Sequence, residues 1–283
     1  MIPAQFEYVR ADSVAQARKL LAKHGEDAKL LAGGHSLIPM MKLRLAQPKV
    51  LIDIARIPGL GSLEIKRDRI TIGALVRHAA LAASGELRRS APALWDAANE
   101  LGDAQVRNRG TIGGACAHGD PAADYPAVML ALDAVFTIES KKKHEVKADE
   151  FFQGMFATAL EPDDVLTAVG FAAAPHSAYV KLHHPASHYA VAGVAARLEV
   201  SGATITAARI AITGVGFTAF RAPHVEQALR GVAVADGERI RAACAGAAKG
   251  VDLRADQYAS AAYRSAMADV FAVRAVEKAL SRS

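Results

Sequence analysis

The sequence predicts an α+β protein in which two α/β units precede a C-terminal unit of antiparallel strands and helices. Three observations support this prediction. In the first half, short apolar runs typical of strands alternate with segments of helical periodicity. Around residues 172–178 the composition changes to Ala-Ala-Ala-Pro-His-Ser-Ala, which is typical of a boundary. Beyond it, three strand-like runs are followed by three alanine-rich helical segments, the order expected of an α+β domain.

The first unit covers residues 1–57. Asp12 or Ser13 can cap a helix that runs to about residue 24, because its apolar residues recur on one face. A second helix is predicted over residues 37–45. Short apolar runs predict strands at residues 6–9, 29–32 and 50–54.

The second unit covers residues 58–175 and completes a predicted domain of residues 1–175. Its central segment, residues 102–119, is rich in Gly, Asn and Asp and has no clear period, which predicts a long functional loop. The remaining predicted elements are strands at 70–75, 134–139 and 144–148 and helices at 77–83, 91–101 and 124–132.

The C-terminal domain is predicted over residues 176–283. Its second and third strands are joined by Ser201-Gly202, a pair typical of a hairpin turn. The predicted elements are strands at 178–183, 190–200 and 203–214 and helices at 222–230, 237–250 and 259–281.

The composition, 52% hydrophobic and 22% charged, is that of an ordinary globular protein. The net charge of +5 is spread along the chain, and the only tight basic run is Lys141 to Lys143. Such a run is more typical of a solvated hairpin tip than of a nucleic-acid surface, so no nucleic-acid partner is expected. A negatively charged cofactor or partner fits the mild excess equally well.

Two cysteines, Cys116 and Cys244, are too few for a disulfide framework, a four-cysteine zinc site or an iron–sulfur cluster. If this protein takes part in iron–sulfur electron transfer, the clusters must therefore lie on another chain. No apolar run is long enough for a membrane span, and the N-terminus lacks a secretory pattern. We expect a cytoplasmic protein with no membrane span.

Two glycine-rich segments are the strongest chemical signal: Ala32, Gly33, Gly34, His35 and Ser36, and Thr111, Ile112, Gly113, Gly114 and Ala115. The first follows a predicted strand and opens a helix. Paired glycines there allow backbone N–H groups to approach a phosphate closely. Two such segments can hold both phosphates of a dinucleotide between them.

The alternative is that each glycine pair is only a tight turn. For a single pair a turn is the better interpretation, but two pairs with polar neighbours leave the two interpretations about even. Neither segment fits the Rossmann or the Walker pattern. The residues therefore support a phosphate-binding cleft, but not one of a common type.

Two aspartates follow the second segment, and three histidines cluster further along the chain. Asp120, before Pro121, is best explained as a helix cap, whereas Asp124, one turn further on, is freer to face a ligand. His183, His184 and His188 cluster around Pro185 without a nearby acidic residue. This pattern favours solvated or interface histidines over a metal site.

Two long strings resemble the FAD-binding medium subunit of the carbon monoxide dehydrogenase and xanthine dehydrogenase family, the molybdenum hydroxylases: LAGGHSLIPMMKLRLAQPKVLIDI (Leu31 to Ile54) and DAQVRNRGTIGGACAHGDPAADYP (Asp103 to Pro126). The resemblance extends over essentially the whole chain. It implies a vanillyl-alcohol-oxidase-type (PCMH) FAD-binding domain of two α/β subdomains. A C-terminal CO-dehydrogenase-flavoprotein-like domain, with a three-stranded antiparallel sheet and helices, would follow.

The resemblance also assigns roles to residues. It implies that Ala32 to Ser36 and Thr111 to Ala115 cradle the FAD pyrophosphate. Asp124 would lie near the flavin, Lys181 beside the isoalloxazine ring, and Tyr189 as an aromatic neighbour of that ring. The resemblance further implies non-covalent FAD, although a Gly-Gly-His setting such as that of His35 carries covalent FAD in some members of the wider flavin superfamily.

The implied function is that of an electron-transfer subunit with no catalytic acid or base. Its partners would be a large molybdopterin subunit and a small subunit with two two-iron two-sulfur clusters, in a dimer of heterotrimers. Electrons would come from those clusters and leave to an external acceptor, and carbon monoxide, aldehydes and N-heterocycles all stay open as substrates. Two alternatives remain: a stand-alone FAD oxidoreductase and a flavin-free assembly module.

Overall fold

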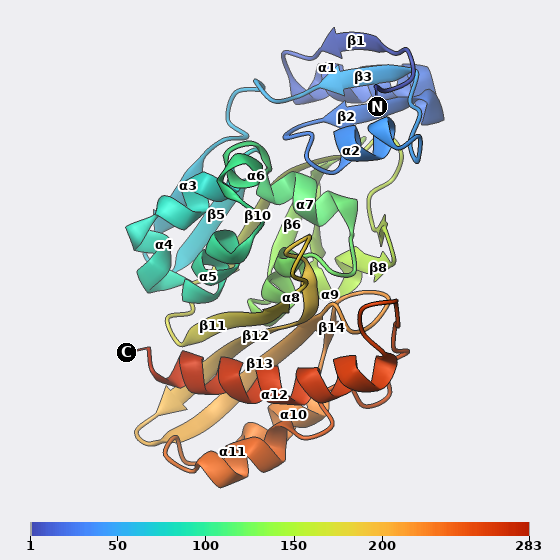
Figure 1. The fold of residues 1–283 in the computed structure, drawn as a ribbon. Helices are drawn as coiled ribbons and strands as arrows, with labels where there is room; N and C mark the ends of the chain where they lie inside the picture. The colour runs from blue at the N-terminus through green and yellow to red at the C-terminus, as the bar shows by residue number, and fades with distance from the viewer. Residues whose placement is uncertain (1, 283) are drawn as a thin grey trace.

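A computed structural model describes residues 2–282 and contains three principal sheets, each with its own helices (Figure 1). The first is a three-stranded parallel sheet of order β1-β3-β2. Ser13 caps its first helix by accepting a hydrogen bond from the Gln16 N–H. The predicted elements of this unit are all present: β1 (Glu7–Arg10), α1 (Val14–His24), η1 (Gly25–Asp27), β2 (Ala28–Leu31), α2 (Leu37–Lys42) and β3 (Val50–Asp53).

The second sheet is antiparallel and has the order β4-β5-β10-β6-β7. Its strands are β4 (Leu63–Lys66), β5 (Arg69–Gly73), β6 (Val135–Glu139), β7 (His144–Lys147) and β10 (Val165–Ala172), with a small hairpin of β8 (Phe152–Gly154) and β9 (Ala157–Thr158) beside it. Its helices are α3 (His78–Ala83), α4 (Gly85–Ser90), α5 (Pro92–Glu100), α6 (Ala104–Arg109), α7 (Ile112–His118), α8 (Asp124–Ala131) and α9 (Ala148–Phe151). Lys141 to Lys143 are exposed in the turn between β6 and β7, as the sequence predicts.

Several features of this unit correct the sequence analysis, which also did not predict β4, α4, α9 or the hairpin of β8 and β9. The expected long loop at residues 102–119 contains the helices α6 and α7, which are six and seven residues long. Helices this short show no apolar period, and they begin instead at the side-chain caps of Asp103 and Thr111. The central strand β10 was also missed, because it is buried almost throughout and therefore lacks alternation.

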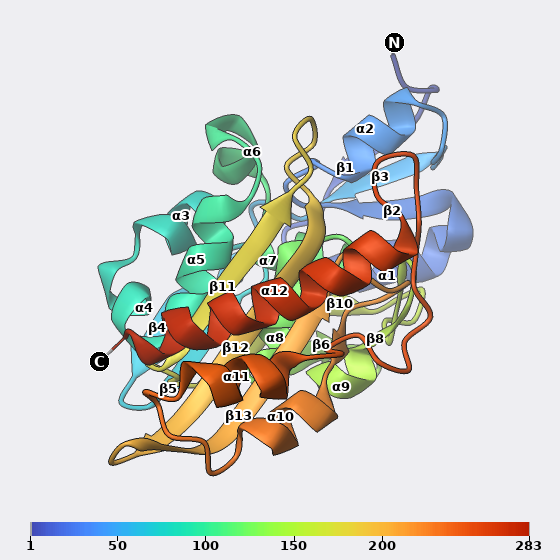
Figure 2. The same cartoon turned by 60° about the horizontal axis from the view of Figure 1, so that its bottom comes forward.

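The third sheet is antiparallel, with the order β11-β12-β13-β14. To the three predicted strands, β11 (Ser177–His183), β12 (Ala190–Ser201) and β13 (Thr204–Thr213), the structure adds the two-residue β14 (Phe220–Arg221). The helices are α10 (Pro223–Leu229), α11 (Gly237–Cys244) and α12 (Ala261–Leu280), and α12 crosses the strands of this sheet (Figure 2).

Helix α11 ends six residues earlier than predicted. Gly246 has a left-handed backbone with φ 69°. The Asp269 carboxylate accepts hydrogen bonds from the N–H groups of Gly246 and Ala247, which satisfies them outside a helix.

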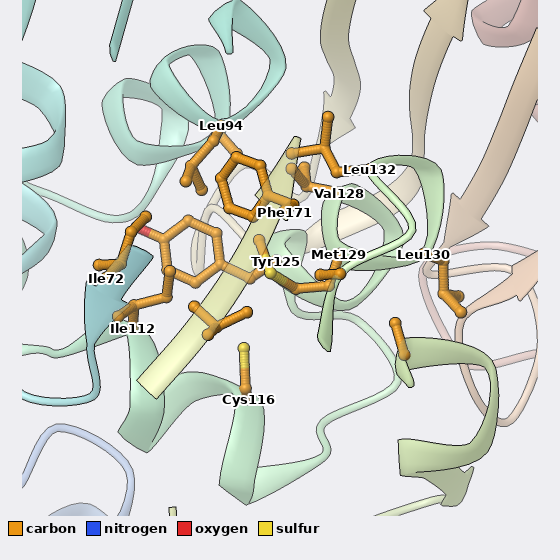
Figure 3. Close-up of a cluster of buried hydrophobic side chains, with 14 of the residues drawn as sticks. Ile72, Leu94, Ile112, Cys116, Tyr125, Val128, Met129, Leu130, Leu132 and Phe171 are labelled. Atoms are coloured by element: carbon orange, nitrogen blue, oxygen red, sulfur yellow. The ribbon is translucent and has the colours of Figure 1, made fainter. Parts of the chain in front are cut away.

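The third sheet is covered on both faces, because α5 and α8 of the second unit pack against it opposite α12. Tyr125 in α8 lies in the core of the second unit among Ile72, Leu94 and Ile112 (Figure 3). The same buried cluster contains Tyr179, Ala195 and Ala211 of the third unit, so it joins the two units and positions the residues at the start of α8. Among the helices of residues 2–282, none combines the length and apolar character needed to cross a membrane.

Candidate functional site

The two glycine-rich segments lie in direct contact. A Cβ atom added at Gly33 would lie 2.2 Å from the Arg109 carbonyl oxygen and 2.8 Å from the Gly110 Cα. Only glycine permits this approach between the turn after β2 and the turn before α7. Gly34 has φ 77°, a backbone conformation that also favours glycine. The folded chain thus brings together the two segments that the sequence singled out (Figure 1).

The first segment offers a row of free donors. Within residues 2–282, no group accepts a hydrogen bond from the backbone N–H groups of Gly33 to Leu37. The Ser36 hydroxyl makes no capping bond to α2 and adds a sixth donor. His35 is exposed, and its Nδ1 lies 3.2 Å from the Gly33 carbonyl. Consecutive free amides of this kind suit an anion such as a phosphate.

The second segment differs from the expected amide nest. The N–H groups of Ile112 and Gly113 donate to the carbonyls of Val76 and Ala74, at 3.0 and 2.9 Å. The Gly114 N–H donates to the Thr111 hydroxyl, and the Ala115 N–H to the Thr111 carbonyl. Gly113 is needed for packing, since its Cβ would lie 2.4 Å from the Cβ of Ala74. Gly114, in contrast, is exposed and leaves an open face.

A neutral histidine supports the contact between the turns. His78 is buried beneath Gly110, where a Cβ would lie 2.5 Å from the His78 Nε2. Burial, reinforced by the charges of His35 and Arg107, lowers the pKa of His78 from 6.5 to about 4. No sequence pattern marks this residue, because a single histidine at the start of a helix has no distinctive spacing.

Asp124 and Lys181 form a buried ion pair at the junction of the two domains. The Lys181 Nζ lies 2.9 Å from the Asp124 carboxylate, and their side chains are 0% and 3% exposed. The carboxylate also accepts a hydrogen bond from the Tyr179 hydroxyl at 2.5 Å. Burial raises the pKa of the Asp124 carboxyl, whereas the charge of Lys181 and the hydrogen bond from Tyr179 limit the rise.

Tyr179 was not predicted as a site residue, although a signal for it exists. It lies two residues before Lys181 on the same strand, and alternate residues of a strand face the same side. Lys181 was expected to be a cation beside the flavin ring; in the structure Asp124 compensates its charge. The Asp124–Lys181 ion pair therefore brings no net charge to the site.

Tyr189 lies at the end of the hairpin between β11 and β12 and is 42% exposed. Desolvation and the carboxylates of Asp120 and Asp124 raise the pKa of Tyr189 to about 12, so its phenol stays neutral at physiological pH. The ring lines an open groove of about 360 Å³ between the two domains. Other residues of the groove are Asp120, Phe156, His184, Arg254 and Arg264.

The three clustered histidines have separate positions. His183 lies 2.5 Å from the Glu100 carboxylate, a residue far from it in sequence. The His184 Nδ1 accepts hydrogen bonds from the N–H groups of Ala186 and Ser187, which shapes the hairpin. His188 has a left-handed backbone with φ 60°. Their contacts are therefore those of hairpin and interface residues.

These features fit a dinucleotide of the FAD type. The free amides and the Ser36 hydroxyl supply donors for a diphosphate, and the close turns leave no room for side chains between them. At the domain junction, the exposed Tyr189 ring lines the groove, and the buried Asp124–Lys181 pair bonds to the neighbouring His188 carbonyl.

Comparison with known proteins agrees with this chemistry. Residues 4–172 match the family described as FAD binding domain in molybdopterin dehydrogenase, and residues 177–279 match the CO dehydrogenase flavoprotein C-terminal domain. The chain is 42% identical to the carbon monoxide dehydrogenase medium chain of Hydrogenophaga pseudoflava, over 100% of this chain and 99% of the relative. It is 33% identical to the glyceraldehyde dehydrogenase medium chain of Sulfolobus acidocaldarius, over 98% of this chain and 99% of that relative.

Solved structures give the same result. A structure of carbon monoxide dehydrogenase from Hydrogenophaga pseudoflava matches with a TM-score of 0.95 and 43% identity, covering 100% of this chain and 99% of the other. Quinoline 2-oxidoreductase from Pseudomonas putida 86 matches with a TM-score of 0.93 and 29% identity, covering 99% of each. In the homologous complexes, FAD is carried by the medium chain, and molybdopterin and iron–sulfur clusters lie on other subunits. The chain therefore belongs to the FAD-binding medium subunits of carbon monoxide dehydrogenase-type molybdenum hydroxylases, which are oxidoreductase subunits.

Proposed function

We propose that this chain takes electrons from two two-iron two-sulfur clusters of a small partner subunit and passes them to an external acceptor. A large molybdopterin subunit would oxidise the substrate, and the three chains would form a dimer of heterotrimers. FAD supplies the redox chemistry when bound, since a flavin exchanges both single electrons and pairs. The role of this chain is to bind, orient and electrostatically tune that cofactor.

The observation that carries the proposal is the row of free amides at Gly33 to Leu37, pressed against the turn at Arg109 and Gly110. We assign the FAD diphosphate to these amides and to the Ser36 hydroxyl. Thr111 to Ala115 contribute mainly through the exposed face of Gly114, because their amides from Ile112 onward are used within the chain.

The flavin ring is assigned to the domain junction beside Asp124, Lys181 and Tyr189. The ion pair is electrically neutral overall, so it presents dipoles rather than a net charge to the ring. The neutral phenol of Tyr189 supplies an aromatic surface. None of these groups has to transfer a proton in this function.

The domain division proposed from the sequence, 1–57, 58–175 and 176–283, is supported by the three sheets, each of which lies within one of these ranges. Both cysteines are free and buried, which fits a reducing compartment such as the cytoplasm.

A matched pair of glycine variants tests the proposal in the complex purified with its partner chains. Gly33→Ala places a Cβ against the Arg109 carbonyl, whereas Gly61→Ala meets nothing within 4 Å. We expect the Gly33→Ala complex to lose the visible flavin absorbance. In this variant complex, substrate should still reduce the iron–sulfur clusters, but the electrons should not reach the external acceptor. The Gly61→Ala complex should behave as wild type.

Full electron delivery to the acceptor by a flavin-free Gly33→Ala complex would refute the proposed electron path. A wild-type complex without flavin absorbance would favour an assembly module instead. Acceptor reduction by the purified chain alone, at the rate of the complex, would favour a stand-alone oxidoreductase.

A further inference from the structure

A buried lysine connects the start of α8 to the hairpin that bears Tyr189. The Lys181 Nζ donates to the Asp124 carboxylate at 2.9 Å and to the His188 backbone carbonyl at 2.8 Å. Asp124 is the first residue of α8, and His188 immediately precedes Tyr189. One ammonium group thus bonds at the same time to the FAD-binding domain and to a hairpin of the C-terminal domain.

The hairpin has few other connections to the protein. Two backbone hydrogen bonds join His184 to Tyr189 and His188 to His184, and the side chain of His184 accepts from two amides, so these bonds all lie within the hairpin. Outside it, the Ala190 N–H donates to the Ala122 carbonyl at 3.2 Å, the His184 ring contacts Tyr258, and the His188 ring lies edge-on to that of His183. The bond from Lys181 is the charged link that reaches the tip.

The backbone at the tip needs such a link. His188 has φ 60°, a conformation that side chains with a Cβ rarely adopt. A strained residue keeps this conformation only when its surroundings hold it. A hydrogen bond from an ammonium is stronger than one from a neutral donor and is well suited to that role.

Lys181 can keep this geometry because Asp124 compensates its charge at a site where both side chains are buried. The Tyr179 hydroxyl in turn bonds to the same carboxylate and limits its rotation. A buried charge that lost its partner would be strongly unfavourable, so the two residues operate as a unit.

We propose that Lys181 and Asp124 are positioning residues that hold the hairpin of residues 184–189, and with it the Tyr189 ring, in place at the groove. Besides their charges, these two residues would then also act on the flavin through the placement of Tyr189. Only this last statement rests on the proposed function; the mechanical coupling of the hairpin to α8 does not.

Amide hydrogen exchange in the purified complex tests the coupling. The double variant Asp124→Asn/Lys181→Met removes both charges together, so no unpaired buried charge is left to unfold the protein. We expect amide exchange in residues 184–189 to become about tenfold faster or more, with exchange in α12 and β12 unchanged, because the hairpin opens locally.

A matched control on α12 contacts the same strand. Lys278 also joins a carboxylate to a β11 carbonyl, donating to Tyr179 at 3.1 Å and pairing with Asp96 at 3.1 Å, but it does not reach the hairpin. Lys278→Met should leave exchange in residues 184–189 at the wild-type rate. Unchanged exchange in the double variant, or an equal increase in Lys278→Met, would overturn the proposal.

The visible flavin spectrum separates the positioning role from a purely structural one. If the pair acts by placing Tyr189, the double variant should shift the flavin band in the same direction as Tyr189→Ala, and Lys278→Met should not. A shift in Tyr189→Ala without one in the double variant would refute the link to Tyr189. A wild-type complex lacking the band altogether would instead refute the proposed function, leaving the exchange result intact.

Discussion

The Tyr125 hydroxyl lies 3.0 Å from the Nδ1 of His78, and both side chains are buried. Tyr125 belongs to α8, whereas His78 begins α3 and lies directly beneath Gly110. The pair therefore connects the core of the second unit to the turn that meets Gly33. It adds to the backbone hydrogen bond at 3.1 Å that the His78 N–H donates to the Gly110 carbonyl, and the two contacts together hold the turn in position.

Acid should destabilise the protein through His78. The folded-state pKa is about 4 and the unfolded value is 6.5, so between these pH values the unfolded chain binds a proton that the folded chain does not. Stability is therefore lost as the pH falls from 6.5 towards 4, by about 3 kcal/mol in total for this group. Urea unfolding at several pH values should show this loss for wild type and for the exposed-residue control His144→Gln, and a smaller loss for His78→Gln. Equal pH slopes in all three would contradict the assignment.

The two glycines of the second segment should respond differently to alanine. Gly113→Ala forces a Cβ against Ala74, and such overpacking costs about 2 kcal/mol. Gly114→Ala meets only the Thr111 hydroxyl, at 2.9 Å, so we expect a stability change below about 1 kcal/mol but weaker FAD binding. Thermal unfolding and the FAD content of the complex check the two parts. Tight FAD binding by Gly114→Ala would remove Gly114 from the site.

The flavin potential should depend on the balance of the Asp124–Lys181 pair. Lys181→Met leaves an uncompensated carboxylate beside the proposed ring position, which disfavours reduction, so we expect a lower flavin potential at alkaline pH. Asp124→Asn/Lys181→Met has no net charge change and should recover most of the wild-type value. Spectroelectrochemical titration measures both. An unchanged potential in Lys181→Met, or an equal fall in the double variant, would contradict this electrostatic role.

FAD should dissociate from the denatured chain. His35 is exposed and follows the glycine pair, but its Nδ1 lies 3.2 Å from the Gly33 carbonyl, a hydrogen bond within the turn. Acid precipitation of the complex should therefore leave a colourless pellet and a yellow supernatant. Colour that stays with the polypeptide of wild type, and is lost in His35→Ala, would show a covalent link instead.

Sequence patterns located most elements because their signals are local. Ser13 caps α1, alternating apolar residues mark the strands, and Gly33 and Gly34 mark a turn that must approach other backbone closely. The short helices α6 and α7 have no such period, and the central strand β10 is apolar on both faces, so both were missed.

The site was only partly predictable, because it depends on contacts between residues that are distant in the sequence. Which amides stay free depends on tertiary packing. The N–H groups of Gly33 to Leu37 find no acceptor within residues 2–282, whereas those of Ile112 and Gly113 donate to carbonyls in the turn after β5. The pairing of Lys181 with Asp124 joins residues 57 positions apart, and no spacing rule predicts it. Chemistry in the site thus depends on contacts that only the fold creates.

Amide exchange of residues 33–37 in the complex, compared before and after removal of FAD, tests the central assignment most directly. These amides have no partner within residues 2–282, so they should exchange quickly without FAD and become protected when it binds. The amides of residues 112–115, which already donate within the chain, should change little. Unprotected amides at residues 33–37 in a complex that contains stoichiometric FAD would contradict the assignment of the diphosphate to this turn.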